Sequence, residues 1–205
     1  MGLHKSKDRS KKTWFGSWAI PAIFIGISII IMFGGEHGKE LLRYDRVWIG
    51  QGEAWRLLSG HFTHLGWSHL ALNSAGLLLV WFLVGESYAI RAWALIILVT
   101  VATIDIGFWF WNPELYWYVG MSGLLHGLLV AGLIPRLRTM DIESGILILL
   151  IVAKIGYEQL AGPVPGSQIT SGGPVVVDAH LYGALGGVLG AVLARINVWT
   201  GTASS

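Results

Sequence analysis

The sequence contains no cysteine and few charged residues. Without cysteine there is no disulfide framework, no thiol nucleophile and no thiolate metal site. Only 13% of the 205 residues are charged, against about 25% in an average soluble domain. The net charge is only +2, and much of the positive charge lies in the first twelve residues. We interpret this basic tail as a topology signal and not as a nucleic-acid patch.

Apolar residues dominate what is present, at 54% of the chain with a mean hydropathy of +0.61. Several apolar runs approach the roughly 20 residues that cross a bilayer. Each span must be helical, because lipid offers no hydrogen-bond partner to the backbone. Six spans are expected, at roughly Trp18–Phe33, Phe62–Leu83, Ala89–Trp111, Val119–Ile134, Ile142–Leu160 and Asp178–Ile196.

The predicted fold class is therefore an all-α membrane protein, a bundle of six transmembrane helices. The bundle is expected to form one domain over residues 17–197, preceded by a basic cytoplasmic tail (1–16) and followed by a short tail (198–205). Three glycines in the last span supply a small face for close helix packing, namely Gly183, Gly187 and Gly190.

Lysine and arginine predict the orientation of the bundle. With the N-terminus in the cytoplasm, the inner segments carry nine basic residues: Lys5, Lys7, Arg9, Lys11, Lys12, Arg91, Arg136, Arg138 and Arg195. The outer segments carry four, all in the first outer loop: Lys39, Arg43, Arg46 and Arg56. This bias predicts a multi-pass protein of a bacterial-type cytoplasmic membrane with its N-terminus inside. The first outer loop, residues 34–60, reads as an amphipathic segment in the membrane interface.

Polar residues gather at one depth in this topology. Spans two, four and six all run from outside to inside, so their N-terminal ends share the outer leaflet. Those ends carry His61, His64, His69 and Asn73 on span two, Ser122 and His126 on span four, and Asp178 and His180 on span six. Convergence on one site explains this distribution better than random scattering of seven histidines.

Ser122 lies between Gly120 and Gly123 at the start of an apolar helix. An isolated membrane serine is usually a small residue in a helix contact. With His180 at equal depth, a serine nucleophile and its base are the better interpretation. A helix start also offers free amides and a positive dipole end that stabilise an oxyanion. Asp178 points about 200° away from His180 on the helix, so we expect a two-residue catalytic unit.

His69 and Asn73 are four residues apart and share a helical face. Two hydrogen-bond donors side by side suit a developing oxyanion, and polar pairs that join helices are the alternative. His61 and His64 also share a face and are expected to lock the first loop. A metal site is not expected, because no His-Glu-x-x-His motif is present.

The chain resembles the rhomboid intramembrane serine proteases in four short motifs. They are Phe62-Thr63-His64, His69 with Asn73, Gly120 with Ser122-Gly123, and Ala179-His180 with Gly183 and Gly187. They fall in order on spans two, four and six. The resemblance implies Ser122 as nucleophile and His180 as base. It also implies an oxyanion hole formed by the Ser122 amide, His69 and Asn73, and no catalytic acid.

One departure points to a branch of that family. Rhomboids usually carry tyrosine four residues after the serine, where this chain has His126. Together with Tyr157-Glu158-Gln159-Leu160 and the stretch Val177 to Gly183, this residue resembles the rhombosortases. That branch is linked to proteins that end in Gly-Gly, an apolar helix and a basic cluster. His126 lies one turn below Ser122 and either supports His180 or replaces the tyrosine in packing.

The expected function is that of an intramembrane serine endopeptidase that cleaves C-terminal Gly-Gly anchors of exported proteins at the outer face of the membrane. Its expected partners are membrane-anchored proteins with a C-terminal transmembrane tail and the lipid bilayer, with no cofactor and no nucleic acid. The alternatives are a general rhomboid protease with other single-span substrates, an inactive relative that binds membrane proteins, and a proton or metal transporter. A transporter would use Asp105, Lys154 and Glu158 with the histidines as a relay.

Two further features stay open between alternatives. Lys154 and Glu158 are four apart on span five, and we expect a mutual ion pair or a link to a neighbouring helix, with substrate docking as the alternative. The outer loop from Gly162 to Val177 holds three prolines and four glycines. It is either a flexible lid over the site or a passive connector.

Overall fold

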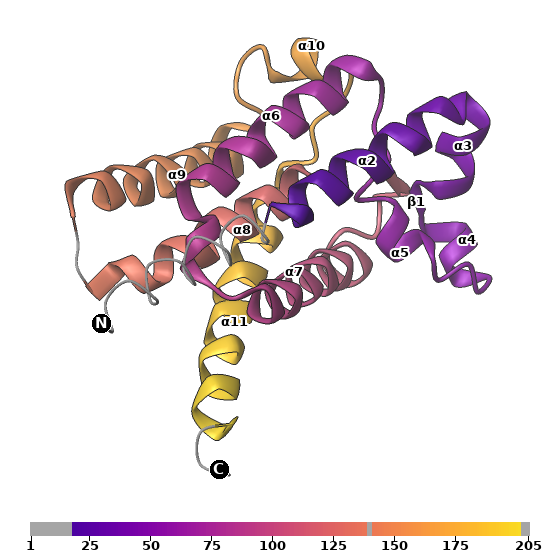
Figure 1. Ribbon diagram of the computed structural model, residues 1–205. Coiled ribbons are helices and arrows are strands. Elements are labelled where there is room, and N and C mark those ends of the chain that lie inside the picture. Colours follow the sequence, from indigo (N-terminus) through magenta and orange to yellow (C-terminus); the bar gives the residue numbers. More distant parts are fainter. Residues whose placement is uncertain (1–17, 139–140, 202–205) are drawn as a thin grey trace.

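The computed structural model describes residues 18–138 and 141–201 (Figure 1), without the side chains of residues 138 and 196–201. The predicted basic tail, residues 1–16, lies outside the described residues, as do residues 202–205 of the predicted C-terminal tail. The last helix runs to Gly201, beyond residue 197, where we expected the domain to end.

Six apolar helices follow the six predicted spans: α2 (Ala19–Phe33), α6 (Trp67–Val84), α7 (Ile90–Trp111), α8 (Ser122–Leu133), α9 (Ile142–Ala161) and α11 (Val177–Gly201). Within the described ranges, four of them are long and apolar enough to cross a membrane, while α2 and α8 are shorter. A 3₁₀ segment, η2 (Ile134–Arg138), continues α8. The chain is thus an all-α, multi-pass membrane protein, as predicted.

Span two begins later than predicted. Residues 61–66 form a turn, and α6 begins only at Trp67, after Gly66 in an extended conformation. His61 and His64 therefore do not share a helical face, contrary to our expectation. The His64 ring instead bonds back to the Phe62 carbonyl within the turn, 3.0 Å away, and a side chain that bonds locally competes with helix formation.

The loop between α2 and α6, predicted to lie outside, is built from short elements: α3 (Gly35–Leu42), β1 (Tyr44–Asp45), α4 (Arg46–Gly50) and α5 (Arg56–Ser59). Strand β1 pairs antiparallel with β2 (Trp117–Tyr118), just before α8. Arg46 donates to the carbonyls of Phe108 and Trp109, at 3.0 and 2.8 Å, where a cation stabilises the C-terminal end of α7. In Figure 1 these elements gather at one end of the bundle. They hold the chain that leads into α8.

Helices α8 and α11 touch through their backbones. A Cβ at Gly183 would overlap the Gly123 carbonyl, and a Cβ at Gly187 would overlap the Gly127 carbonyl. Gly190 in turn packs against Ile96 of α7. The predicted small face of α11 is thus confirmed, and close approach of this kind joins helices in lipid. Gly123, in the first turn of α8, also packs against the first turn of α11, because a Cβ there would lie 2.7 Å from the Ala179 carbonyl oxygen. The start of α8 therefore lies beside the start of α11.

The loop between α9 and α11 contains the short helix α10 (Ser167–Ser171), which the irregular stretch 162–166 joins to α9. In Figure 1 α10 lies over the N-terminal end of α6. Gly173, just after α10, contacts the Leu65 side chain, because a Cβ there would lie 2.8 Å from Leu65 Cδ1. We call residues 162–176 the cap segment.

Candidate active site

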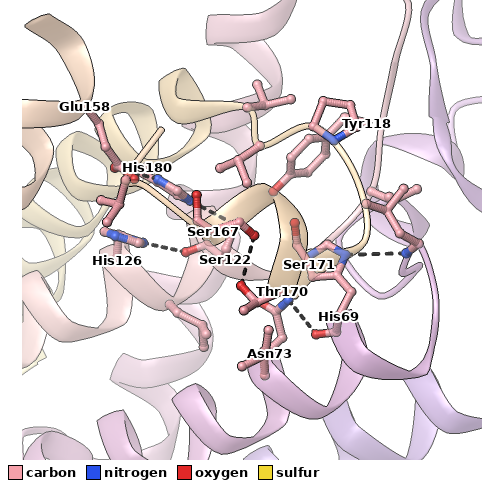
Figure 2. A pocket seen from close by; sticks show the side chains of 18 of the residues that line it. His69, Asn73, Tyr118, Ser122, His126, Glu158, Ser167, Thr170, Ser171 and His180 are labelled. Carbon is pink, nitrogen blue, oxygen red and sulfur yellow. Dashed lines mark hydrogen bonds and ion pairs between the residues drawn. The ribbon is translucent and has the colours of Figure 1, made fainter. Parts of the chain in front are cut away.

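The Ser122 hydroxyl and the His180 imidazole meet at the junction of α8 and α11. Ser122 Oγ lies 3.0 Å from His180 Nε2, and His180 is buried. Figure 2 shows the two side chains pointing toward one another across the helix junction. The geometry is that of a hydroxyl and a base within proton-transfer distance.

Glu158 of α9 lies on the other side of the His180 ring. Its Oε2 is 2.7 Å from His180 Nδ1 and 2.7 Å from Lys154 Nζ. The predicted ion pair between Lys154 and Glu158 is confirmed. The carboxylate at His180 differs from the two-residue unit that we expected. Asp178 is not that carboxylate, because its Oδ2 accepts a bond from Asn112 Nδ2, at 2.6 Å.

His126 stacks on His180. The ring centroids are 4.1 Å apart and the ring planes differ by 17°. Its Nδ1 lies 2.7 Å from the Ser122 carbonyl oxygen, and because a carbonyl only accepts, Nδ1 must carry the proton. His126 therefore contacts both members of the pair, through its ring face with His180 and through a hydrogen bond with the Ser122 backbone.

His69 and Asn73 share the face of α6 that borders the site, as predicted. The Leu65 amide donates to His69 Nδ1, at 3.4 Å, so the neutral ring carries its proton on Nε2 and can donate from there. Asn73 Nδ2 donates to the His69 carbonyl, at 3.0 Å, and its second N–H is available to another acceptor. Both residues line the same cavity as Ser122.

Gly120 lets the serine turn pass close to His69. Its φ is +119°, a conformation that favours glycine, and a Cβ there would lie 2.8 Å from His69 Cε1. The Gly120 amide donates to the Gly60 carbonyl in the loop between α2 and α6, at 3.1 Å. Gly123 has the second role already described, the contact with α11. Of the two glycines near Ser122, Gly120 therefore permits the close approach of His69, and Gly123 permits the close approach of α11.

His61 and His64 hold the turn before α6. His64 is buried, with its ring edge against His69 at a centroid distance of 5.1 Å. Burial lowers the pKa of His64 to about 3, so the ring is neutral and Nδ1 donates to the Phe62 carbonyl. His61 Nε2 lies 3.3 Å from Asp105 Oδ1 of α7. These contacts fix the loop between α2 and α6 against the bundle, the role expected for both residues.

A cavity of about 620 Å³ adjoins the serine. It is bordered by α6, α8, α9 and α11, by the segment before α8 and by the cap segment, whose lining residues include the hydroxyl side chains of Ser167, Thr170 and Ser171. Figure 2 shows Thr170 and Ser171 on the side of the cavity away from Glu158. Sequence reasoning did not single them out, because serine and threonine in a loop carry no depth signal. It also missed Tyr118, whose buried hydroxyl donates to the Gly120 carbonyl, at 2.7 Å.

The side chains of His126, Glu158 and His180 have possible ligand atoms within 4.8 Å of one another. Their arrangement does not suit a metal ion, for two reasons. The two imidazoles are stacked, so their in-plane lone pairs run nearly parallel instead of converging on one point. The Lys154 ammonium already occupies the cation position at the carboxylate. The geometry therefore favours proton transfer to and from the serine.

Comparison with known proteins agrees with this chemistry. The Rhomboid domain family model matches residues 51–196. The chain is similar to "Rhomboid protease GluP" of Bacillus subtilis, with 28% identity over 182 residues. The match covers 82% of this chain and 33% of that protein, so the chain spans about a third of its relative's length.

Proposed function

Because the chain belongs to the rhomboid family, we propose that it is an intramembrane serine endopeptidase with Ser122 as nucleophile and His180 as general base. The observation that carries the proposal is the distance of 3.0 Å between Ser122 Oγ and His180 Nε2. The pair lies beside a cavity lined by two further hydrogen-bond donors. An inactive relative would have no need of this complete arrangement.

The reaction begins when a peptide carbonyl of the substrate enters the cavity. The Ser122 hydroxyl gives its proton to His180 Nε2 while Oγ bonds to the carbonyl carbon, which forms a tetrahedral oxyanion. When this intermediate collapses, the C–N bond breaks and His180 returns the proton to the leaving amine. Water then attacks the acyl-enzyme with His180 again as base, and the new acid and the free serine are released.

The oxyanion is stabilised by donors from two helices. Ser122 is the first residue of α8, so its amide has no partner within the helix and lies at the positive end of the dipole. His69 Nε2–H and the second amide N–H of Asn73 come from α6. Donors held in place before the reaction cost no reorganisation when the charge develops.

The position of Ser122 within the helix bundle bears on the substrate class that we propose. A nucleophile inside a helix bundle reaches only a chain that enters from the membrane or unwinds there. Glycine destabilises a helix by about 1 kcal/mol relative to alanine, so a Gly-Gly pair at the outer end of an anchor helix exposes its amides. We propose cleavage at or near such a pair in C-terminal anchors, as the rhombosortase resemblance implies.

The location follows from the same proposal. A basic cluster after the substrate anchor holds that end in the cytoplasm, so the glycines lie outside. The protein then sits in the bacterial-type cytoplasmic membrane with its N-terminus inside and Ser122 toward the outer face. Cleavage there releases the outer domain of the substrate from its anchor.

Co-expression with a tailed reporter tests the proposal. The reporter carries an outer domain, Gly-Gly, an apolar helix and a basic cluster, and its matched control carries Ala-Ala. We expect release of the Gly-Gly reporter by the wild type, much less release of the Ala-Ala reporter, and none by Ser122→Ala. Equal release of both reporters would refute the substrate class and favour a rhomboid protease with other single-span substrates. Release by Ser122→Ala would refute the protease proposal itself.

A further inference from the structure

Glu158 is a buried carboxylate in the last turn of the membrane helix α9, and the proposed reaction does not yet use it. Only 2% of its side chain is exposed, and the stretch of α9 from Gly145 to Ala153 that precedes Lys154 is entirely apolar. A charged group at such a position is expensive and is usually retained for function. Its neighbours are the Lys154 ammonium and the His180 imidazole, both 2.7 Å from the same oxygen, Oε2.

The contacts determine which nitrogen of His180 carries the proton. Lys154 Nζ and His180 Nδ1 are 3.3 Å apart, and two interpretations of this distance compete. If the ammonium donated to Nδ1, the ring proton would sit on Nε2 and face Ser122. The ring would then have no lone pair for the serine proton.

The carboxylate decides between them. Its bond to Nδ1 is shorter than the contact of Lys154 with Nδ1, 2.7 against 3.3 Å, and a carboxylate only accepts. Nδ1 must therefore carry a proton, and the 3.3 Å is the separation of two donors that share one acceptor. With Nδ1 protonated, the Nε2 lone pair of the neutral ring faces the Ser122 hydroxyl.

We propose that Glu158 is the positioning residue of His180, so that the site operates as a serine, a histidine and a carboxylate rather than as an unassisted pair. This inference rests on the proposed function and deepens it. Glu158 holds the imidazole in the tautomer that accepts the serine proton, and its charge stabilises the imidazolium that forms during the reaction. Lys154 keeps the carboxylate charged and turned toward the ring.

A purely structural ion pair does not account for this arrangement. The Lys154 side chain is 36% exposed and borders the cavity. An ion pair between residues one helical turn apart could therefore form at an exposed position, without burial of Glu158. Such exposed pairs contribute little to stability. Burial of the carboxylate beside His180 costs more than that, and the hydrogen bond to the imidazole is what the burial provides.

The test uses the full-length enzyme in detergent or vesicles and a cleaved reporter. Glu158→Gln keeps the shape and removes the charge, and Glu158→Ala removes the group. The matched control is Glu143→Gln, which changes an exposed glutamate in the first turn of the same helix. We expect Glu158→Gln to lower kcat by about 10²- to 10⁴-fold, with KM nearly unchanged because the group acts through His180.

Added formate distinguishes a positioning role from a structural one. Glu158 borders the cavity, so formate can take the place of the missing carboxylate in Glu158→Ala, and we expect it to raise kcat of this variant. A kcat of Glu158→Gln within about threefold of the wild type would overturn the inference, as would a folded Glu158→Ala that formate leaves unchanged. Failure of the proposed function has a different signature, namely wild-type turnover that persists in Ser122→Ala.

Discussion

His69 and Asn73 lie one turn apart but are prepared for donation in different ways. The Leu65 amide fixes the tautomer of His69. Asn73 donates one N–H of its side-chain amide to the His69 carbonyl, and its second N–H is available to the oxyanion. We predict that His69→Ala and Asn73→Ala each lower kcat by about ten- to a thousandfold, the range for a lost oxyanion donor. Reporter turnover by folded, membrane-inserted protein measures the effect. Full activity in both variants would remove α6 from the oxyanion site.

His126 occupies the place where rhomboids usually have tyrosine. Its ring stacks on His180 at 4.1 Å and its Nδ1 binds the Ser122 carbonyl. Tyrosine keeps the stacked ring but not this hydrogen bond. We predict that His126→Tyr retains activity within about tenfold, because stacking alone positions the neighbouring ring. A collapse of turnover in a protein that still unfolds at the wild-type temperature would instead assign a specific role to the imidazole.

At the scale of the element, α9 shows why one helical turn can serve two purposes. Lys154 and Glu158 pair with one another, yet Glu158 also reaches His180 on α11. Each single charge reversal, Lys154→Glu or Glu158→Lys, places like charges one turn apart and should lower stability. The double reversal restores the pair and should recover part of the lost stability, measured by thermal unfolding in detergent.

Activity should not recover in the double reversal, because it brings an ammonium to the Nδ1 side of His180. An ammonium cannot accept the Nδ1 proton, so the ring loses the tautomer required for the serine. Wild-type turnover in the double variant would contradict this account. Stability lost equally in the single and double variants would show that the main partners of the pair lie elsewhere.

The cap segment is either a flexible lid over the site or a passive connector, and a cross-link can distinguish the two. It borders the cavity with the hydroxyl residues of α10 and lies against Leu65, just before α6, and Ser68, in the first turn of α6. The chain has no cysteine, so Ser68→Cys and Thr170→Cys form a unique pair for a short thiol cross-linker. We predict that cross-linking abolishes reporter cleavage, because the substrate can no longer pass between α6 and the cap. Undiminished turnover of cross-linked protein would reject the lid, and each single-cysteine variant is the control.

At the scale of the whole molecule, the sequence predicts the depth of each polar residue in the membrane but not the direction in which its side chain points. Hydropathy and the positive-inside rule predicted all six apolar helices, and they placed Ser122, His69 and His180 at one level. The same topology puts the C-terminal part of span five at that level too, and this was the available signal for Glu158. The predicted topology does not give the rotation of each helix about its axis. That rotation is set by packing, here by glycine contacts between α8 and α11.

The turn of residues 61–66 shows a second limit. Its apolar and polar residues continue the pattern of the following helix, so hydropathy placed the start of the span at Phe62. The local hydrogen bond of His64 and the extended Gly66 end the pattern earlier. Such side chain–backbone bonds are not visible in a hydropathy profile.

We propose that the bundle brings one nucleophile and one base together, and covalent labelling of Ser122 tests this claim most directly. A fluorophosphonate probe reacts only with a serine whose proton is removed by a neighbouring base. We predict that the probe labels the wild type at Ser122, that labelling is lost in Ser122→Ala and His180→Ala, and that the double variant is no less active than either single one, because the two residues act as a unit. Labelling that persists in Ser122→Ala, or turnover that survives this substitution, would contradict the account.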